Sequence, residues 1–130
     1  MATPFETPGA FSWNELITTD PAAAKRFYGE LLGWSFKDMD MGPSGVYSVV
    51  NAGGQDCAGI MACPQQAAGM PPMWGGYVTV NDVDASAKRV AELGGTVLLG
   101  PLDIPNVGRF CAIRDPQGAM ISLITYLKRG

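Results

Sequence analysis

The sequence of 130 residues contains no histidine. This absence excludes Ser-His-Asp and Cys-His catalysis, and it excludes every metal site that depends on an imidazole ligand. Any acid–base chemistry must therefore use the side chains of Asp, Glu, Tyr, Lys or Cys.

Charge is also scarce. Charged residues make up 16% of the chain, against about 25% in a typical globular domain. Apolar residues make up 47%, which is enough for one hydrophobic core. A chain with so few charges must bury neutral surface in a core, a cavity or a subunit interface. We expect a homodimer, because the scarce charge leaves neutral surface that a second subunit can cover. The net charge of −3 argues against nucleic-acid binding, which needs a basic face.

Other absences bear on the compartment. No apolar run approaches the ~20 residues of a membrane helix, and residues 1–9 do not resemble a secretory signal. The three cysteines, Cys57, Cys63 and Cys111, are an odd number without metal-like spacing, which indicates reduced thiols. We therefore expect a cytoplasmic protein without a membrane partner.

The hydrophobic pattern predicts two similar halves. An alternating strand begins at Phe11, a helix runs from Asp20-Pro21 to Gly33, and three strands follow. The second half repeats this order, with a helix capped by Asp82 or Asp84. The fold class is therefore α+β, in which two βαβββ modules form a curved sheet around a cleft.

We expect one domain over residues 1–130. Module one spans about residues 9–63 and module two about residues 74–127. Residues 64–73 between them are rich in Pro, Gln, Ala, Gly and Met, which is typical of a linker.

Motifs in both halves resemble one known family. In the first half they are Asp20, Phe27-Tyr28 and Leu31-Leu32-Gly33-Trp34. In the second half they are Val80-Asn81-Asp82-Val83-Asp84, Leu93-Gly94-Gly95, Gly108-Arg109 and Asp115-Pro116-Gln117-Gly118. They resemble the vicinal oxygen chelate superfamily of glyoxalases, bleomycin-resistance proteins and extradiol dioxygenases. The resemblance covers about residues 11–127 and implies a single domain of the glyoxalase/bleomycin-resistance type.

A narrower resemblance is to a bacterial glyoxalase-like subgroup whose members mostly lack an assigned reaction. It is carried by Trp13-Asn14-Glu15-Leu16 and by Ile104-Pro105 with Gly108-Arg109-Phe110.

The family's metal ligands do not carry over to this sequence. Its first-strand His falls on Trp13, the equivalent in module two falls on Gly75, and the last-strand Glu falls on Ser122. The remaining ligand should fall within Gly59 to Met61, which has no oxygen or nitrogen donor in its side chains. The resemblance therefore implies that the usual metal site is lost, and we expect no metal and no other cofactor.

Glu15 is the first candidate catalytic residue. Alternation places it on the strand face of Trp13 and Ile17, which the family pattern implies is the concave face. Desolvation there would raise the pKa of the carboxyl toward the range of a general acid or base. Glu15 could instead pair with Arg109, accept hydrogen bonds across the sheet, or lie in water.

Two more residues are candidates for catalysis. Tyr77 occupies in module two the place that Glu15 holds in module one, and could donate a hydrogen bond to a ligand. Arg109 could bind a carboxylate or an enolate oxygen through the N–H groups of its planar guanidinium. Both have structural alternatives, because half-buried tyrosines are common in strands and Arg109 could pair with Asp103 or Asp115.

The candidate ligand-binding residues are mostly aromatic or polar side chains expected near the cleft. They are Trp13, Glu15, Tyr47, Met61, Trp74, Tyr77, Arg109 and Ser122. Aromatic and methionine side chains suit apolar recognition, but each of them could equally be ordinary core. Cys111 is a weaker candidate, since a reactive thiol needs a cationic neighbour such as Arg109.

These observations favour a glyoxalase-like domain with a lost metal site that binds a small apolar or aromatic molecule in its cleft. The alternative is a metal-independent isomerase or lyase. In that case Glu15 would move a proton, and Tyr77 or Arg109 would stabilise the oxyanion. A third interpretation is a metal enzyme whose site is rebuilt from Glu15 and other oxygens.

Overall fold

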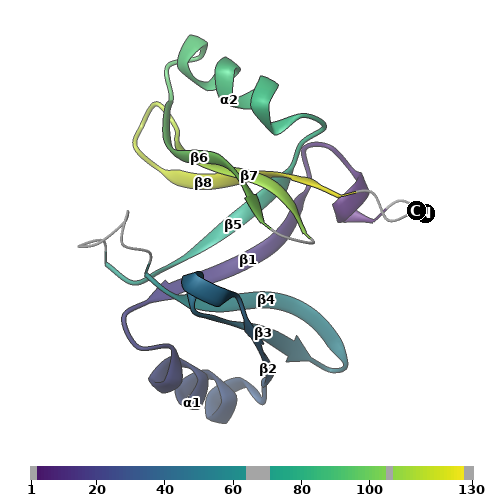
Figure 1. Ribbon diagram of the computed structural model, residues 1–130, viewed down its shortest axis with the longest axis vertical. Helices are drawn as coiled ribbons and strands as arrows, with labels where there is room; N and C mark the ends of the chain where they lie inside the picture. Colours follow the sequence, from purple (N-terminus) through teal and green to yellow (C-terminus); the bar gives the residue numbers. More distant parts are fainter. Residues whose placement is uncertain (1–2, 64–70, 105–106, 128–130) are drawn as a thin grey trace. The chain divides into compact units, whose positions relative to one another are not determined.

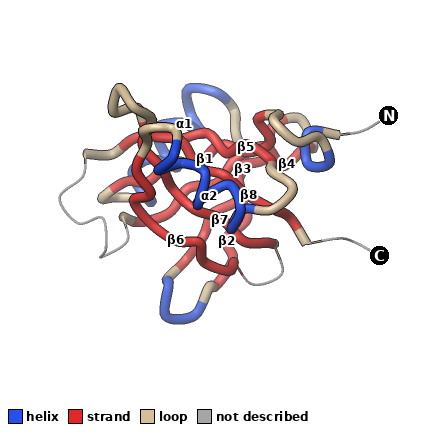
Figure 2. Tube along the Cα trace, turned by 90° about the horizontal axis from the view of Figure 1, so that it is seen from above, coloured by secondary structure: helices blue, strands red, loops and turns tan. Residues whose placement is uncertain are grey.

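The computed structural model describes residues 3–63, 71–104 and 107–127. Strands, red in Figure 2, dominate this part of the chain. Its helices and strands follow the order β1 (Phe11–Thr18), α1 (Pro21–Leu32), β2 (Ser35–Asp40), β3 (Val46–Ala52), β4 (Gln55–Ala62), β5 (Met73–Thr79), α2 (Val83–Glu92), β6 (Thr96–Ile104), β7 (Gly108–Arg114) and β8 (Met120–Tyr126). Two short 3-10 helices are η1 (Pro4–Glu6) and η2 (Gly42–Ser44).

This order confirms the predicted α+β class and the two βαβββ modules (Figure 1). Most of the predicted linker, residues 64–70, lies outside the described residues, as does Pro105 of the subgroup motif. The described chain divides into two compact units, whose boundaries fall within β1 and β5. The N-terminal unit contains residues 14–75, and the C-terminal unit contains residues 3–13 and 76–127. The predicted cleft between the modules stays a prediction.

The sheet of the N-terminal unit has the strand order β2-β3-β4-β1, and α1 packs on one of its faces (Figure 1). β1 runs parallel to β4, whereas the β2–β3 and β3–β4 pairs are antiparallel. Leu16, Val50 and Ile60 form the core with Ala58, and Tyr28 of α1 packs against them. The alternation predicted for β1 is confirmed where it placed Leu16 toward the helix.

Capping residues determine where α1 begins and ends and where α2 begins. The Asp20 carboxylate accepts a hydrogen bond from the backbone N–H of Ala23 at 3.0 Å, and α1 ends at Gly33 with φ +73°. Of the two caps considered for α2, Asp82 is the one present. It accepts from the backbone N–H groups of Asp84 and Ala85 at 3.0 and 3.2 Å.

The C-terminal unit has the strand order β5-β8-β7-β6, with β5 parallel to β8. Val83 and Val90 of α2 are buried. The segment before β1 also belongs to this unit, because the Thr79 hydroxyl donates to the carbonyl of Pro4 at 2.8 Å. None of the helices in the described part of the chain has the length and apolar character needed to cross a membrane.

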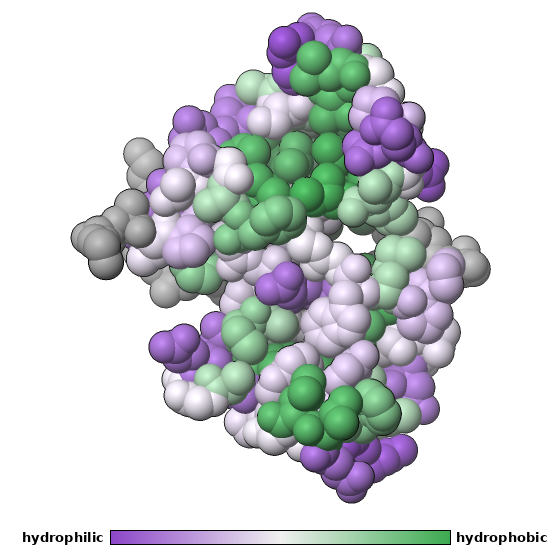
Figure 3. Space-filling model, turned by 180° about the vertical axis from the view of Figure 1, so that it is seen from behind, coloured by the Kyte–Doolittle hydropathy of each residue, from purple (hydrophilic) through white to green (hydrophobic). Residues whose placement is uncertain are grey.

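α1 keeps several large apolar side chains in solvent. Phe27, Leu31 and Leu32 are 61%, 63% and 52% exposed. Figure 3 shows an apolar area at the lower end of the view, the end at which α1 lies in Figure 1. Exposed apolar groups of this kind are surface that an association between subunits can bury.

A substitution at Ile60 tests the packing of the N-terminal core, because the Ile60 side chain is fully buried. We expect Ile60→Ala to lower the free energy of unfolding by about 2–5 kcal/mol in urea denaturation. Val46→Ala is the matched control, since Val46 on β3 is 53% exposed and its truncation should cost under about 0.5 kcal/mol. Equal losses in the two variants would contradict this packing.

Candidate functional site

Glu15, Tyr47 and Met61 lie on one face of the N-terminal sheet. Glu15 of β1 is the register partner of Gly59 on β4, and Met61 is the partner of both Ile17 and Tyr47. Register partners point to the same side of a sheet, and successive residues point to opposite sides. These five residues therefore face away from α1, and we call their surface the Glu15 face.

Gly59 determines where the Tyr47 ring lies on this face. A Cβ atom at position 59 would overlap the phenol ring of Tyr47, its hydroxyl most closely. The hydroxyl end of the ring therefore covers Gly59, which is the register partner of Glu15. The missing side chain lets a phenol lie over the residue that pairs with Glu15, although Glu15 and Tyr47 are 32 positions apart in the sequence.

The chemistry of the Glu15 face is mixed. Glu15, Tyr47, Ile17 and Met61 are all half-buried. A carboxylate accepts hydrogen bonds and a phenol can donate or accept one, so together they can hold a polar group of a ligand. The thioether of Met61 and the side chain of Ile17 supply adaptable apolar surface beside these polar groups.

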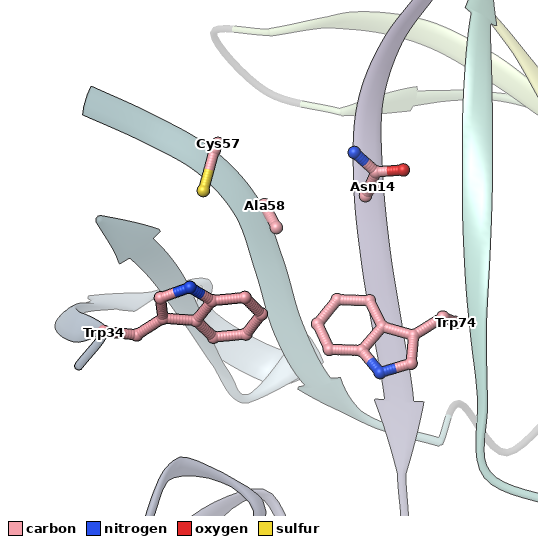
Figure 4. A pocket seen from close by; sticks show the side chains of 5 residues that line it. All are labelled: Asn14, Trp34, Cys57, Ala58 and Trp74. Carbon is pink, nitrogen blue, oxygen red and sulfur yellow. The ribbon is translucent and has the colours of Figure 1, made fainter. Parts of the chain in front are cut away.

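Trp74 does not lie on the Glu15 face. It lines a pocket of about 330 Å³ together with Asn14, Trp34, Cys57 and Ala58 (Figure 4). This pocket lies on the α1 side of the sheet. The physical reason is a contact with α1, in which the indole Nε1–H of Trp74 donates to the Tyr28 hydroxyl at 3.0 Å.

The other four pocket residues were not among those predicted from the sequence to bind a ligand. Trp34 carried a usable signal, since it directly follows the glycine that ends α1 and must pack against that helix. Cys57 carried no such signal in the sequence. A register shift between β3 and β4 turns its side chain toward the same side as Ala58. Such bulges redirect a side chain without a clear sequence pattern.

In the C-terminal unit, Tyr77 and Ser122 are register partners and therefore share a sheet face. The Phe110 ring lies 6.1 Å from that of Tyr77, measured between centroids. Tyr77 is buried, and Ser122 is half-buried. Trp13 also belongs to this unit and is half-buried. A ligand-binding role for these residues stays a prediction.

Arg109 lies on the opposite face from Tyr77 and does not converge with it. Its Nε and Nη2 atoms donate to the two carboxylate oxygens of Asp84 at 2.9 and 3.1 Å, and Nη1 donates to Asp103 at 3.1 Å. These hydrogen bonds lower the pKa of Asp84 and raise the pKa of Arg109. The guanidinium fork therefore joins the start of α2 to β6, and Asp103 is one of the two ion-pair partners that the sequence suggested.

Cys111 shares the face of Arg109, as expected from alternation along β7. Its side chain is fully buried. Burial, and secondarily the negative charge of Asp84, raise the pKa of the Cys111 thiol. The thiol therefore stays protonated at neutral pH and is a poor nucleophile.

The positions to which the resemblance carries the family's metal ligands hold no His, Asp or Glu in this chain. The positions hold the indole of Trp13, no side chain at Gly75, and the hydroxyl of Ser122. At the remaining position the Tyr47 ring occupies the space over Gly59. Among residues 3–63, 71–104 and 107–127, no three His, Cys, Asp or Glu side chains lie together as metal ligands would.

The chain belongs to the Glyoxalase/Bleomycin resistance protein/Dioxygenase superfamily, whose family model matches residues 10–123. The resemblance noted in the sequence is therefore confirmed.

Two curated relatives and one solved structure illustrate the likeness. "Putative glyoxylase CFP32" of Mycobacterium tuberculosis is 43% identical over 88% of this chain and 45% of its own length. "Anthracycline biosynthesis protein DauV" of a Streptomyces species is 32% identical over 89% of this chain and 46% of its own length. The chain thus spans about half the length of the curated relatives it matches. Methylmalonyl-CoA epimerase from M. tuberculosis shares the fold, with 18% identity, a TM-score of 0.60, and coverage of 92% of this chain and 89% of its own.

A double-mutant cycle tests the contact between Gly59 and Tyr47. We expect Gly59→Ala to displace the phenol and to lower the free energy of unfolding by about 1–3 kcal/mol, as overpacking does. In the Tyr47→Ala background the added methyl group meets open space, so the same substitution should cost well under about 1 kcal/mol. Urea denaturation of the four proteins measures the coupling. Strictly additive costs would show that the ring does not lie over Gly59.

Proposed function

We propose that this glyoxalase-like domain binds a small aromatic molecule on the Glu15 face and that it does so without a resident metal ion. The observation that supports this best is the placement of the Tyr47 phenol over Gly59, the register partner of Glu15. The phenol and the carboxyl would hold a hydroxyl or carbonyl group of the ligand. Met61 and Ile17 would contact its apolar rings.

The relatives support the aromatic class of the ligand. One of them, 32% identical, is named an anthracycline biosynthesis protein, and anthracyclines are polycyclic aromatic compounds with phenol and quinone oxygens. Such a molecule would offer both the flat apolar surface and the polar groups that the Glu15 face suits. We also propose a homodimer, for which the exposed apolar side chains of α1 provide surface to bury.

Native mass spectrometry and a binding titration of the untagged protein test this function, with 1,4-dihydroxyanthraquinone as the probe. We expect a metal-free protein that binds one molecule per chain. Glu15→Gln and Tyr47→Phe should each weaken binding about 3- to 10-fold, since each removes one hydrogen-bonding partner. The same spectra count the subunits.

Glu30→Gln is the matched control, because Glu30 is an exposed carboxylate on α1 of the same unit. It should leave the affinity unchanged. Unchanged affinity in the Glu15 and Tyr47 variants would move the ligand away from this face. A stoichiometric divalent ion in the mass spectrum would instead point to a rebuilt metal site.

The same geometry supports a second function, a metal-independent isomerase. Glu15 would take a proton from the carbon next to a carbonyl group, and the electron pair would move onto the carbonyl oxygen. The Tyr47 phenol would donate a hydrogen bond to that oxyanion. Where the first carbon carries a hydroxyl group, its hydroxyl proton would move to the oxyanion, and Glu15 would deliver the abstracted proton to the former carbonyl carbon, which completes the isomerisation. Tyr47 replaces Arg109 in this proposal, because Arg109 is held by Asp84 and Asp103.

Deuterium exchange distinguishes this second function from simple binding. Untagged protein is incubated with hydroxyacetone in D2O, and proton NMR follows the loss of the protons next to its carbonyl. An isomerase should accelerate exchange over buffer, and Glu15→Gln should remove about a hundredfold or more of that acceleration, while Glu30→Gln keeps it. Exchange at the rate of buffer alone, or full activity of Glu15→Gln, would reject this function.

A further inference from the structure

We infer that the pocket on the α1 side of the N-terminal sheet is a second binding site, which takes a neutral, flat aromatic molecule of one or two rings. This inference goes beyond the proposed function, because the pocket and the Glu15 face lie on opposite sides of the sheet. Asn14 alternates with Glu15 along β1, and Ala58 alternates with Gly59 along β4. A ligand in this pocket therefore does not touch the Glu15 face.

Two indole rings form the walls of the pocket. The centroids of Trp34 and Trp74 lie 5.8 Å apart, and the ring planes meet at 80° (Figure 4). Rings this close leave no room for a third ring between them, so a flat ligand would lie in the corner that they form, stacked on one indole and in edge contact with the other. Both arrangements are favourable for aromatic pairs.

One tyrosine holds both walls in place. The ring of Tyr28 on α1 stacks on Trp34 at 5.4 Å with an interplanar angle of 26°. Its hydroxyl accepts the hydrogen bond from the indole Nε1–H of Trp74. The two indoles are thus oriented before a ligand arrives, which reduces the entropy lost on binding.

The remaining lining residues define the size and polarity of the ligand. Ala58 leaves the pocket open to about 330 Å³, near the lower end of the ~300–1,000 Å³ typical of ligand pockets. Asn14 is exposed and its amide can both donate and accept a hydrogen bond. The five lining residues include no Asp, Glu, Lys or Arg, so nothing in the lining favours a charged ligand.

The indole N–H signals in a ¹H–¹⁵N NMR spectrum test this site, because the chain has 3 tryptophans and only two of them line the pocket. The probe is 2-naphthol, whose two flat rings carry one hydroxyl group. We expect saturable shifts of the Trp34 and Trp74 signals, while the Trp13 signal stays in place. Cyclohexanol, which has the hydroxyl but no aromatic ring, should bind far more weakly.

Variants separate this site from the Glu15 face. Asn14→Ala, at an exposed position where folding is not at risk, should weaken 2-naphthol binding about 3- to 10-fold through the lost hydrogen bond. Glu15→Gln should leave the Trp34 and Trp74 shifts unchanged, whatever it does to anthraquinone binding. No saturable shift at these two indoles, or shifts that disappear in Glu15→Gln, would overturn the inference.

Discussion

The parallel pairing of β1 with β4 is the constraint on which the N-terminal unit depends. It joins strands separated by a helix and two further strands, and it sets Leu16 beside Ile60 and Glu15 beside Gly59. Because side chains alternate along both strands, one register assigns the first pair to the core under α1 and the second pair to the opposite face. A slip by one residue would bury the carboxyl and expose the core.

Both proposed sites follow from this register. On the Glu15 face, the glycine that pairs with Glu15 admits the Tyr47 ring, so a phenol lies over the position opposite Glu15. On the α1 side, Ala58 lines a pocket together with the indoles of Trp34 and Trp74. Small residues at two successive positions of β4 thus leave space on each side of one sheet.

Membership of the family explains the fold but not the chemistry, because the residues of the site, rather than the fold, decide function. The positions to which the resemblance carries the family's metal ligands hold Trp13, Gly75 and Ser122, and the Tyr47 ring lies over Gly59. Arg109 is likewise committed to the structure, since it joins α2 to β6 through two carboxylates. The proposed sites therefore use the Glu15 carboxyl and aromatic side chains rather than a metal ion or Arg109.

The sequence by itself determined the local features. Local preferences within a few residues determine the Asp20 cap and the end of α1 at Gly33. Alternation along β1 likewise determines that Glu15 lies on the face away from α1. Only the tertiary structure decided that Tyr47 covers Gly59, that Trp74 turns to Tyr28, and that Arg109 binds Asp84. Each of these contacts joins residues distant in sequence, and strand register and helix packing, which no local pattern encodes, bring them together.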